Sequence, residues 1–160
     1  MKITKGRRRA GTQGGLILHP TDFSSASRAA LARAIAEART GGAELLLVHV
    51  LSPVTPFIGG DEYMSPRTYT DLQRSMQAYA QKQLDKLVAK AKAAGVRVRG
   101  LLLEGTTAEA IVRAARSKRA GVIVIGTHGR TGLGRLLMGS VAERVVGTAP
   151  CPVLTVRGKK

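Results

Sequence analysis

The chain has 160 residues, a length that fits one globular domain. Hydrophobic residues make up 44% of it and charged residues 22%, a balance that excludes a disordered chain. Lysine and arginine number 26 against 10 acidic residues, and the net charge of +16 favours anionic partners such as nucleotides, nucleic acid or acidic membranes. The single cysteine excludes an internal disulfide, and no apolar run approaches the roughly 18 residues that cross a bilayer. We therefore expect a cytoplasmic protein with no transmembrane segment.

The first 14 residues differ from the rest of the chain. Lys2, Lys5 and the run from Arg7 to Arg9 gather positive charge, and the glycines around them interrupt any helix or strand pattern. We expect residues 1–14 to form a flexible basic tail and residues 15–157 to form a single domain.

The first part of the domain alternates strand and helix signals. Residues 15–19 are a short apolar run that ends at Pro20, which predicts a strand. A helix follows, capped by Ser24 or Ser25 and ended by the two glycines at 41–42. Residues 44–51 are apolar on both faces, which is typical of a strand buried between helices.

The middle of the chain begins with a long connection over residues 52–66 that is rich in proline and glycine. Connections of this length in compact domains are lids or binding segments, or else they are disordered. A long amphipathic helix ended by Gly95 follows. Its predicted apolar face consists of Leu72, Met76, Tyr79, Leu84, Leu87, Val88 and Ala91. Residues 96–103 begin with alternating polarity, which indicates a strand near an edge of the sheet.

The last third repeats the alternation. A helix capped by Thr106 or Thr107 leads to a buried strand at residues 122–125 and then to a glycine-rich turn over residues 126–138. A short helix at 139–147 and a strand at 152–156 complete the pattern. Alternating strands and helices predict an α/β fold, with one open parallel sheet and helices on both of its faces.

Ligands of open α/β sheets bind beyond the carboxyl ends of the strands, so the turns after the strands are the first candidates for a site. After the first strand, Pro20, Thr21 and Asp22 combine a rigid turn with a hydroxyl and a carboxylate that can bond a ribose or a base edge. The alternative is that Thr21, Asp22 or Ser24 only caps the following helix.

The glycine-rich turn is the second candidate, because glycines let backbone N–H groups approach an anion and the dipole of the following helix favours a phosphate. The residues of this turn that can take part in phosphate binding are Gly126, His128, Gly129, Arg130, Gly139 and Ser140. The turn is not a P-loop, since Arg135 and Leu136 replace the required lysine and hydroxyl residue. The alternative is a flexible surface turn.

Taken together, these motifs resemble the universal stress protein family over residues 15–157. Gly126-x2-Gly129-x9-Gly139-Ser140 has the spacing of the ATP-binding motif of that family. The resemblance extends to the segments Leu18 to Ser24, Leu47 to Val50, Val124 to Arg130, Gly139 to Glu143 and Pro150 to Leu154.

The resemblance implies a five-stranded parallel sheet in the order 3-2-1-4-5, which brings both candidate turns to one crevice. It places adenosine along Pro20, Thr21 and Asp22, and adenine against Val50. It assigns the ribose and the α-phosphate to Ile125 and Gly126, and phosphates to Gly129, Gly139, Ser140 and Val141. It also implies a homodimer that forms through the last strand, Val153–Val156.

We therefore interpret the chain as a stress-response regulatory protein that binds ATP, AMP or ADP, with Mg or Mn bound through the phosphates. At most slow hydrolysis is expected, because phosphoryl transfer needs a base and metal-holding acids, and His128 is the only candidate base. Ala142 stands where some ATP-binding members carry a hydroxyl residue, so one phosphate hydrogen bond is expected to be missing. The alternative is a DNA- or RNA-binding protein that uses its basic surface and the N-terminal tail.

Overall fold

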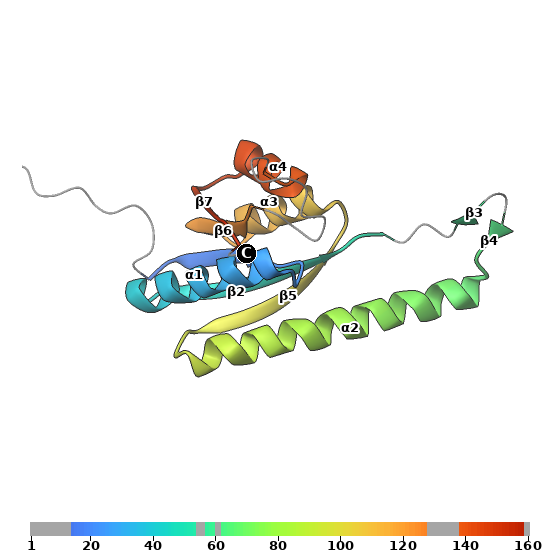
Figure 1. The fold of residues 1–160 in the computed structure, drawn as a ribbon, viewed down its shortest axis with the longest axis horizontal. Helices are drawn as coiled ribbons and strands as arrows, with labels where there is room; N and C mark the ends of the chain where they lie inside the picture. The colour runs from blue at the N-terminus through green and yellow to red at the C-terminus, as the bar shows by residue number, and fades with distance from the viewer. Residues whose placement is uncertain (1–13, 54–56, 60–61, 128–137, 159–160) are drawn as a thin grey trace, which may run out of the picture.

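The computed structural model of the chain describes residues 14–53, 57–59, 62–127 and 138–158. Its main sheet lies in the order β5-β2-β1-β6-β7, and all four neighbouring pairs are parallel (Figure 1). Counted along the chain among these five strands, the order is 3-2-1-4-5, as the family resemblance implied. The strands are β1 (Leu16–Pro20), β2 (Glu44–Leu51), β5 (Val98–Glu104), β6 (Val122–Gly126) and β7 (Val153–Val156).

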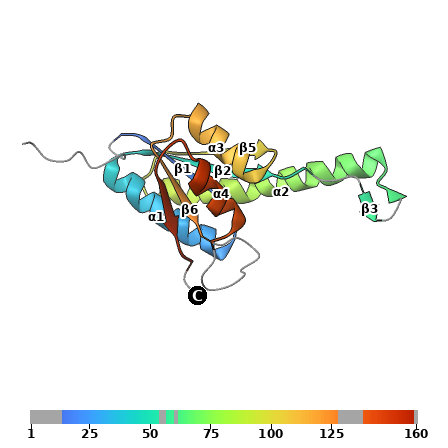
Figure 2. The ribbon, with the colours of Figure 1, turned by 90° about the horizontal axis from the view of Figure 1, so that it is seen from above.

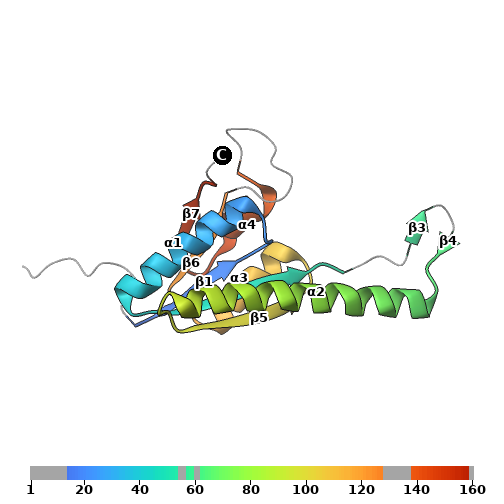
Figure 3. The ribbon, with the colours of Figure 1, turned by 60° about the horizontal axis from the view of Figure 1, so that its bottom comes forward.

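Helices cover both faces of the sheet, as the alternating pattern predicted. α1 (Ser25–Gly41) and α2 (Pro66–Ala93) pack on one face, and α3 (Thr107–Ser117) and α4 (Ser140–Thr148) pack on the other (Figure 2, Figure 3). The chain winds from β1 outward to β5 and then returns to β6, so the direction of winding reverses between β1 and β6. A crevice at such a reversal is where proteins of this architecture bind ligands.

Two apolar layers hold the helices to the sheet. Ile17 and Leu47 point to the α1 and α2 face, where they pack with Leu84 of α2. Leu46 points to the opposite face and packs with Ile111 of α3. Because both faces are covered, the successive residues Leu45 to Val48 of β2 are all buried, which explains the unbroken apolar run there.

Local signals begin and end the helices at the expected places. Ser24 is the N-cap of α1, and its side chain accepts a hydrogen bond from the Ser27 N–H at 3.2 Å. Gly42 ends α1 in the left-handed conformation, with a φ of 63°. Thr106 is the N-cap of α3, although its side chain makes no capping hydrogen bond. α1 and α3 therefore begin directly beyond the carboxyl ends of β1 and β5.

α2 occupies the predicted residues but differs from the prediction in its burial. It begins at Pro66, and Leu72, Met76 and Tyr79 are 36%, 39% and 58% exposed. The 28 residues of the helix span about 42 Å, whereas the 7 residues of β5 span about 23 Å. Because the helix is longer than the strands it covers, its first half extends past the sheet (Figure 1).

The connection before α2 contains an antiparallel pair that the composition did not predict, β3 (Phe57–Gly59) and β4 (Glu62–Tyr63). The pair lies at the outer end of α2 (Figure 1). Of the expected N-terminal tail, residues 1–13 lie outside the described part of the chain. Within the described ranges, no helix is long and apolar enough to cross a membrane.

Candidate functional site

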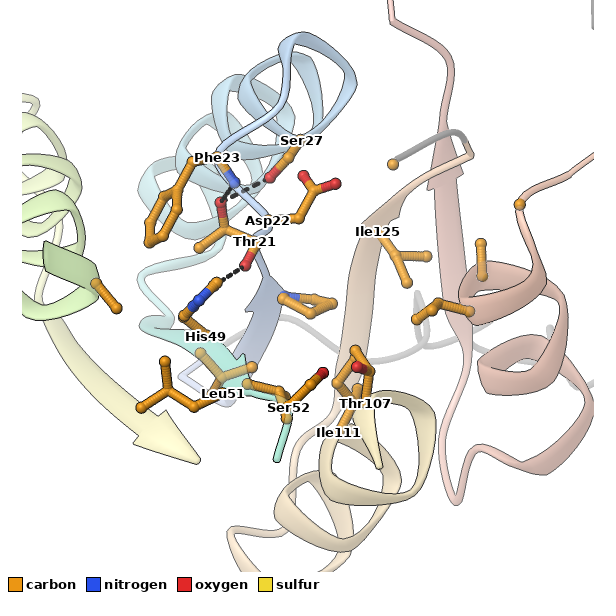
Figure 4. A pocket seen from close by; sticks show the side chains of 18 of the residues that line it. Thr21, Asp22, Phe23, Ser27, His49, Leu51, Ser52, Thr107, Ile111 and Ile125 are labelled. Atoms are coloured by element: carbon orange, nitrogen blue, oxygen red, sulfur yellow. Dashed lines mark hydrogen bonds between the residues drawn. The ribbon is translucent and has the colours of Figure 1, made fainter. Parts of the chain in front are cut away.

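A cavity of about 530 Å³ opens at the carboxyl ends of β1, β2 and β6. This volume lies within the range of pockets that hold small molecules. Figure 4 shows Thr21 and Asp22 on one side of the cavity and Ile125 projecting from β6. Thr107 and Ile111 of α3 lie across the cavity from the β1 turn. The cavity therefore occupies the place where the winding of the sheet reverses.

The turn after β1 is held by its own side chains. The Thr21 hydroxyl oxygen accepts hydrogen bonds from the Phe23 N–H at 3.1 Å and from the Ser27 hydroxyl at 2.7 Å. Asp22 Oδ1 accepts the Ser24 N–H at 3.0 Å. Ser24 is the residue that caps α1, so Thr21 and Asp22 shape the turn ahead of the cap instead of providing it. This geometry fixes where Thr21 and Asp22 stand at the cavity wall.

Two aromatic side chains hold the same turn in place: Phe23, which is part of the turn, and His49 of β2. The backbone of Phe23 has a φ of 65°, a region that bulky residues rarely adopt and that is often found at functional sites. Its ring stacks on the His49 imidazole with centroids 4.4 Å apart. His49 Nδ1–H donates to the Thr21 carbonyl at 2.7 Å, which ties the end of β2 to the β1 turn (Figure 4).

His19 lies fully buried in β1, below the site. Its Nδ1–H donates to the Val124 carbonyl at 2.8 Å, while burial leaves Nε2 without a hydrogen-bond partner among the described residues. Burial lowers the pKa of His19 from 6.5 to about 4, because a charged imidazolium would lose its hydration there. A neutral His19 therefore links β1 to β6 directly beneath the cavity.

Gly126 ends β6 where the chain passes close to α1. A Cβ at this position would stand 3.1 Å from the carbonyl group of Ala26, so a larger residue would push the first turn of α1 away. The next residue, Thr127, joins two elements: its N–H donates to the Val156 carbonyl at 2.9 Å, and its carbonyl accepts the Gly139 N–H at 2.7 Å. The two ends of the glycine-rich turn are therefore held together at its base.

The N-terminus of α4 provides backbone donors at the cavity. Its first helical hydrogen bond runs from the Glu143 N–H to the Gly139 carbonyl, so the N–H groups of Ser140, Val141 and Ala142 have no partner within the helix. Such N–H groups and the helix dipole favour an anion. The Gly139 N–H already bonds to Thr127, so the anion would meet the N–H groups that follow it.

The structure brings the sequence-predicted site residues together. Nine of them line the one cavity: Pro20, Thr21, Asp22, Val50, Ile125, Gly126, Gly139, Ser140 and Val141. The other three, His128, Gly129 and Arg130, lie outside the described residues. Ala142 also lines the cavity, with a side chain that is buried against the α3 and α4 layer.

The sequence analysis missed several lining residues. Phe23 follows the end of β1, His49 lies near the carboxyl end of β2, and Thr107 begins the helix after β5. The rule that ligands lie beyond the carboxyl ends of strands could have found all three. Met76 and Tyr79 of α2 also reach the cavity, but their helical spacing is the spacing of core residues, so no sequence signal separates the two roles.

The described residues hold no group of three or more His, Cys, Asp or Glu side chains that is placed to bind a metal ion. Cys151, next to β7, is half-buried, and burial raises the pKa of its thiol, which keeps it protonated. The site is therefore built from backbone donors, hydroxyls, apolar walls and the Asp22 carboxylate.

The fold and the cavity define a doubly wound α/β protein with a ligand crevice between β1 and β6. The profile of the universal stress protein family matches residues 16–157, and the chain belongs to that family. It is 40% identical over 144 residues to universal stress protein MJ0531 of Methanocaldococcus jannaschii (90% of this chain, 82% of the relative). It is 41% identical over 143 residues to a universal stress protein of Thermus aquaticus (88% and 97%). The solved structure of MJ0577 superposes with a TM-score of 0.77 at 26% identity, covering 92% of this chain and 99% of that one.

Two further solved structures with this fold contain adenine nucleotides. The Arabidopsis thaliana protein has AMP bound; it is 22% identical, with a TM-score of 0.65 and coverage of 91% of this chain and 92% of that one. The Archaeoglobus fulgidus protein is in complex with dAMP; it is 24% identical, with a TM-score of 0.60 and coverage of 91% and 98%. At these identities the likeness shows a shared fold.

Proposed function

We propose that the chain binds an adenine nucleotide, ATP, ADP or AMP, and acts as a stress-response regulator through a nucleotide-dependent change of shape or of partner affinity. The observation that carries this proposal is one cavity that joins the Thr21–Asp22 turn to the start of α4. Proteins of the same fold hold AMP and dAMP, which supports it. We also propose that the protein is cytoplasmic.

The two ends of the cavity suit the two ends of a nucleotide. In this proposal Val50 and Ile111 would form apolar walls for the adenine, and Ile125 would border the ribose. A ribose hydroxyl would donate to the Asp22 carboxylate. The N–H groups of Ser140 and Val141 would meet the phosphates. A divalent cation, Mg or Mn, would arrive on the phosphates, since the chemistry of the described lining supplies a single carboxylate.

The lining favours binding over rapid turnover. Fast phosphoryl transfer needs a positioned base and a cationic clamp on the transferred group. No lysine or arginine is found among the lining residues that the structure describes. We therefore propose at most slow hydrolysis.

Proline at position 140 offers a sharp test of the phosphate site. Ser140 is the first residue of α4, where proline is well tolerated, and Gly139 already has the extended backbone (φ −61°, ψ 147°) that must precede a proline. Ser140→Pro removes one N–H donor and one hydroxyl without breaking a helical bond. Losing a charge-assisted hydrogen bond costs about 1.5–3 kcal/mol, so the affinity for ATP is expected to fall roughly 10- to 100-fold.

The matched control is Ser140→Ala, which removes the hydroxyl and keeps the N–H. Isothermal titration with ATP, AMP and adenosine separates the two effects, and adenosine should bind both variants as it binds the original chain. Unchanged ATP affinity in Ser140→Pro would mean that the phosphates do not lie at α4. Failure of the original chain to bind any of these ligands at millimolar concentration would refute the proposed function itself.

We also propose that the chain forms a homodimer through the open edge of β7. The main sheet has two edges, β5 and β7. β5 carries Arg99 and Glu104, and charges on an edge strand oppose pairing with another chain. β7 consists of Val153, Leu154, Thr155 and Val156, and it bears no charge. Its edge is therefore the one that suits a second copy.

A further inference from the structure

The end of the molecule opposite the cavity is formed by the connections that lead into the strands. Backbone hydrogen bonds join these connections: the Gly14 N–H donates to the Gly41 carbonyl at 3.0 Å, and the Gly121 N–H donates to the Leu16 carbonyl at 2.8 Å. We call the surface formed by residues 39–42, 90–99 and 116–121 the amino-end face. Because its backbone is tied into the sheet, the side chains that it presents start from fixed positions.

The amino-end face concentrates positive charge. It presents exposed cations from the ends of α1, α2 and α3 and from the start of β5, namely Arg39, Lys90, Lys92, Arg97, Arg99, Arg116, Lys118 and Arg119. These residues lie far apart in the sequence. They lie on one face because every connection that leads into a parallel strand arrives at the amino end of that strand. The fold therefore gathers a charge that the sequence spreads over three segments.

Ion pairs among the described residues neutralise one of these eight cations. Glu44, at the start of β2, forms an ion pair with Arg99 at 2.6 Å, and Glu37 of α1 forms one with Arg33. Asp71 and Asp85 are exposed on α2. Asp22, Glu104, Glu109 and Glu143 stand at the carboxyl ends of strands or in the first turns of helices, beside the cavity end. At the cavity end Glu109 forms an ion pair with Arg144 at 2.8 Å, so that end carries cations as well as acids. Of the eight cations of the amino-end face, seven form no ion pair among the described residues.

Arg119 shows that helix ends alone do not account for these cations. A cation in the last turn of a helix complements the helix dipole, which explains residues such as Arg39 and Arg116. Arg119 lies beyond α3 with a φ of 54°, in the left-handed region that favours glycine. The corresponding turns after α1 and α2 use Gly42 and Gly95, with φ of 63° and 79°. An arginine therefore occupies a position where glycine would relieve the backbone.

The remaining chemistry of the face points to a phosphate backbone. The exposed large hydrophobic side chains of the described residues lie on α2 and α4, so the face has no apolar anchor for a protein core or a bilayer. The segments that form it also contain no aromatic residue, so it has no platform on which unpaired bases could stack. A cluster of cations on a fixed backbone, with no apolar or aromatic residue at its centre, suits the phosphate backbones of a duplex.

We propose that the amino-end face binds the phosphate backbone of double-stranded nucleic acid, without regard to base sequence and separately from the nucleotide cavity at the opposite end. The adenine nucleotide would then bind at the carboxyl ends of the strands, and the duplex would bind at their amino ends.

Two variants with the same net charge test the proposal. The face variant carries Lys90→Gln, Lys118→Gln and Arg119→Gly, and the control variant carries Arg67→Gln, Arg74→Gln and Lys82→Gln, all exposed on α2 away from the face. Affinity for a labelled DNA duplex of arbitrary sequence is measured by fluorescence anisotropy over a series of salt concentrations. The face variant is expected to lose roughly 100-fold in affinity at 0.1 M salt and about 3 in the slope of log K against log salt.

The control variant should keep affinity and slope close to those of the original chain. Equal losses in both variants would mean that total charge, and not the amino-end face, governs binding, and would overturn the proposal. So would an unchanged face variant. Vesicles containing phosphatidylserine serve as competitor: if they displace the duplex at matched charge concentration, the surface recognises membranes and the assignment to nucleic acid is wrong.

Arg119→Gly alone separates binding from stability. Glycine relieves the left-handed backbone, so the unfolding temperature should stay the same or rise while DNA affinity falls a few-fold. A fall in both would show that Arg119 has a structural role and would remove it from the proposed surface. Because Ser140→Pro alters the opposite end, that variant should bind the duplex like the original chain, whatever it does to ATP.

Discussion

At the scale of single residues, His19 makes the stability of the fold depend on pH. Its pKa in the folded chain is about 4, below the 6.5 of an exposed histidine, so the unfolded chain binds the extra proton between these values. Stability should therefore fall as pH drops from about 6.5 to about 4 and should lose nothing more from this group below that. The shift corresponds to about 3 kcal/mol at pH 4. Urea unfolding at a series of pH values measures it.

His19→Asn is the matched variant, because an amide N–H can replace the Nδ1–H donor to the Val124 carbonyl and does not titrate. Carboxylates add to the pH dependence of both proteins, so the informative quantity is the difference between the two curves. Parallel curves between pH 4 and pH 6.5 would show that His19 does not oppose protonation in the folded chain.

Single residues also show how much of the site could be predicted from the sequence. Thr21 and Asp22 could be placed at the cavity because they follow a strand, and β1 does end there. Their hydrogen bonds within the turn could not be predicted, since they depend on the left-handed backbone of Phe23 and on His49, which is 28 positions away from the Thr21 carbonyl. The Gly139 N–H was predicted to bind a phosphate, but it donates to the Thr127 carbonyl. That bond depends on how the two ends of the glycine-rich turn meet, which the sequence does not indicate.

At the scale of elements, α2 consists of two halves with different surroundings. Residues 66–79 extend past the sheet, and none of them is buried, whereas Ala80, Leu84 and Ala91 pack against it. An isolated helix of that length is marginal in water, so the first half should open without global unfolding. We expect amide hydrogen exchange in residues 66–79 to be at least tenfold faster than in residues 80–93, as measured by mass spectrometry.

Dilution provides the control for this measurement. If the two halves exchange at the same rate in concentrated protein and diverge on dilution, a second copy covers the exposed Leu72, Met76 and Tyr79. If they exchange equally at every concentration, the outer half of α2 is stable by itself, contrary to its exposure.

The positions of the helices and strands could largely be predicted from the sequence, whereas the burial of their apolar side chains could not. Apolar spacing located α2, and Gly95 marked its end, because both signals act within a few residues. Whether an apolar stripe is buried depends on the length of the strands beneath it, and β5 is too short to cover the stripe at Leu72 and Met76. Period and composition carry no information about that length difference.

At the scale of the whole molecule, alternation of strands and helices was enough to predict a parallel sheet with two covered faces. It could not supply the order of the strands, because any right-handed winding of β-α units is consistent with the same pattern. The order came from the resemblance in the segments around Pro20 and Gly126, and the structure has that order. The gathering of cations at the amino-end face follows from the parallel sheet together with the positions of these cations along the chain.

The order also leaves β7 with one open side, and its hydrogen bonds identify the groups that face outward. The Ile123 N–H donates to the Pro152 carbonyl at 3.0 Å, and the Thr127 N–H donates to the Val156 carbonyl at 2.9 Å. Because backbone groups alternate along a strand, the N–H and carbonyl of Thr155 point away from β6 to the open edge. A second copy that pairs with β7 would bond to that N–H.

Thr155→Pro removes this one donor and leaves the bonds to β6 intact, a position at which edge strands accept proline. If dimers form through β7, the variant should be monomeric by light scattering at concentrations where the original chain is dimeric, with an unchanged circular dichroism spectrum. Thr155→Val keeps the N–H and should remain dimeric. A Thr155→Pro variant that still dimerises would place the contact elsewhere, and the exposed apolar stripe of α2 would become the next surface to test.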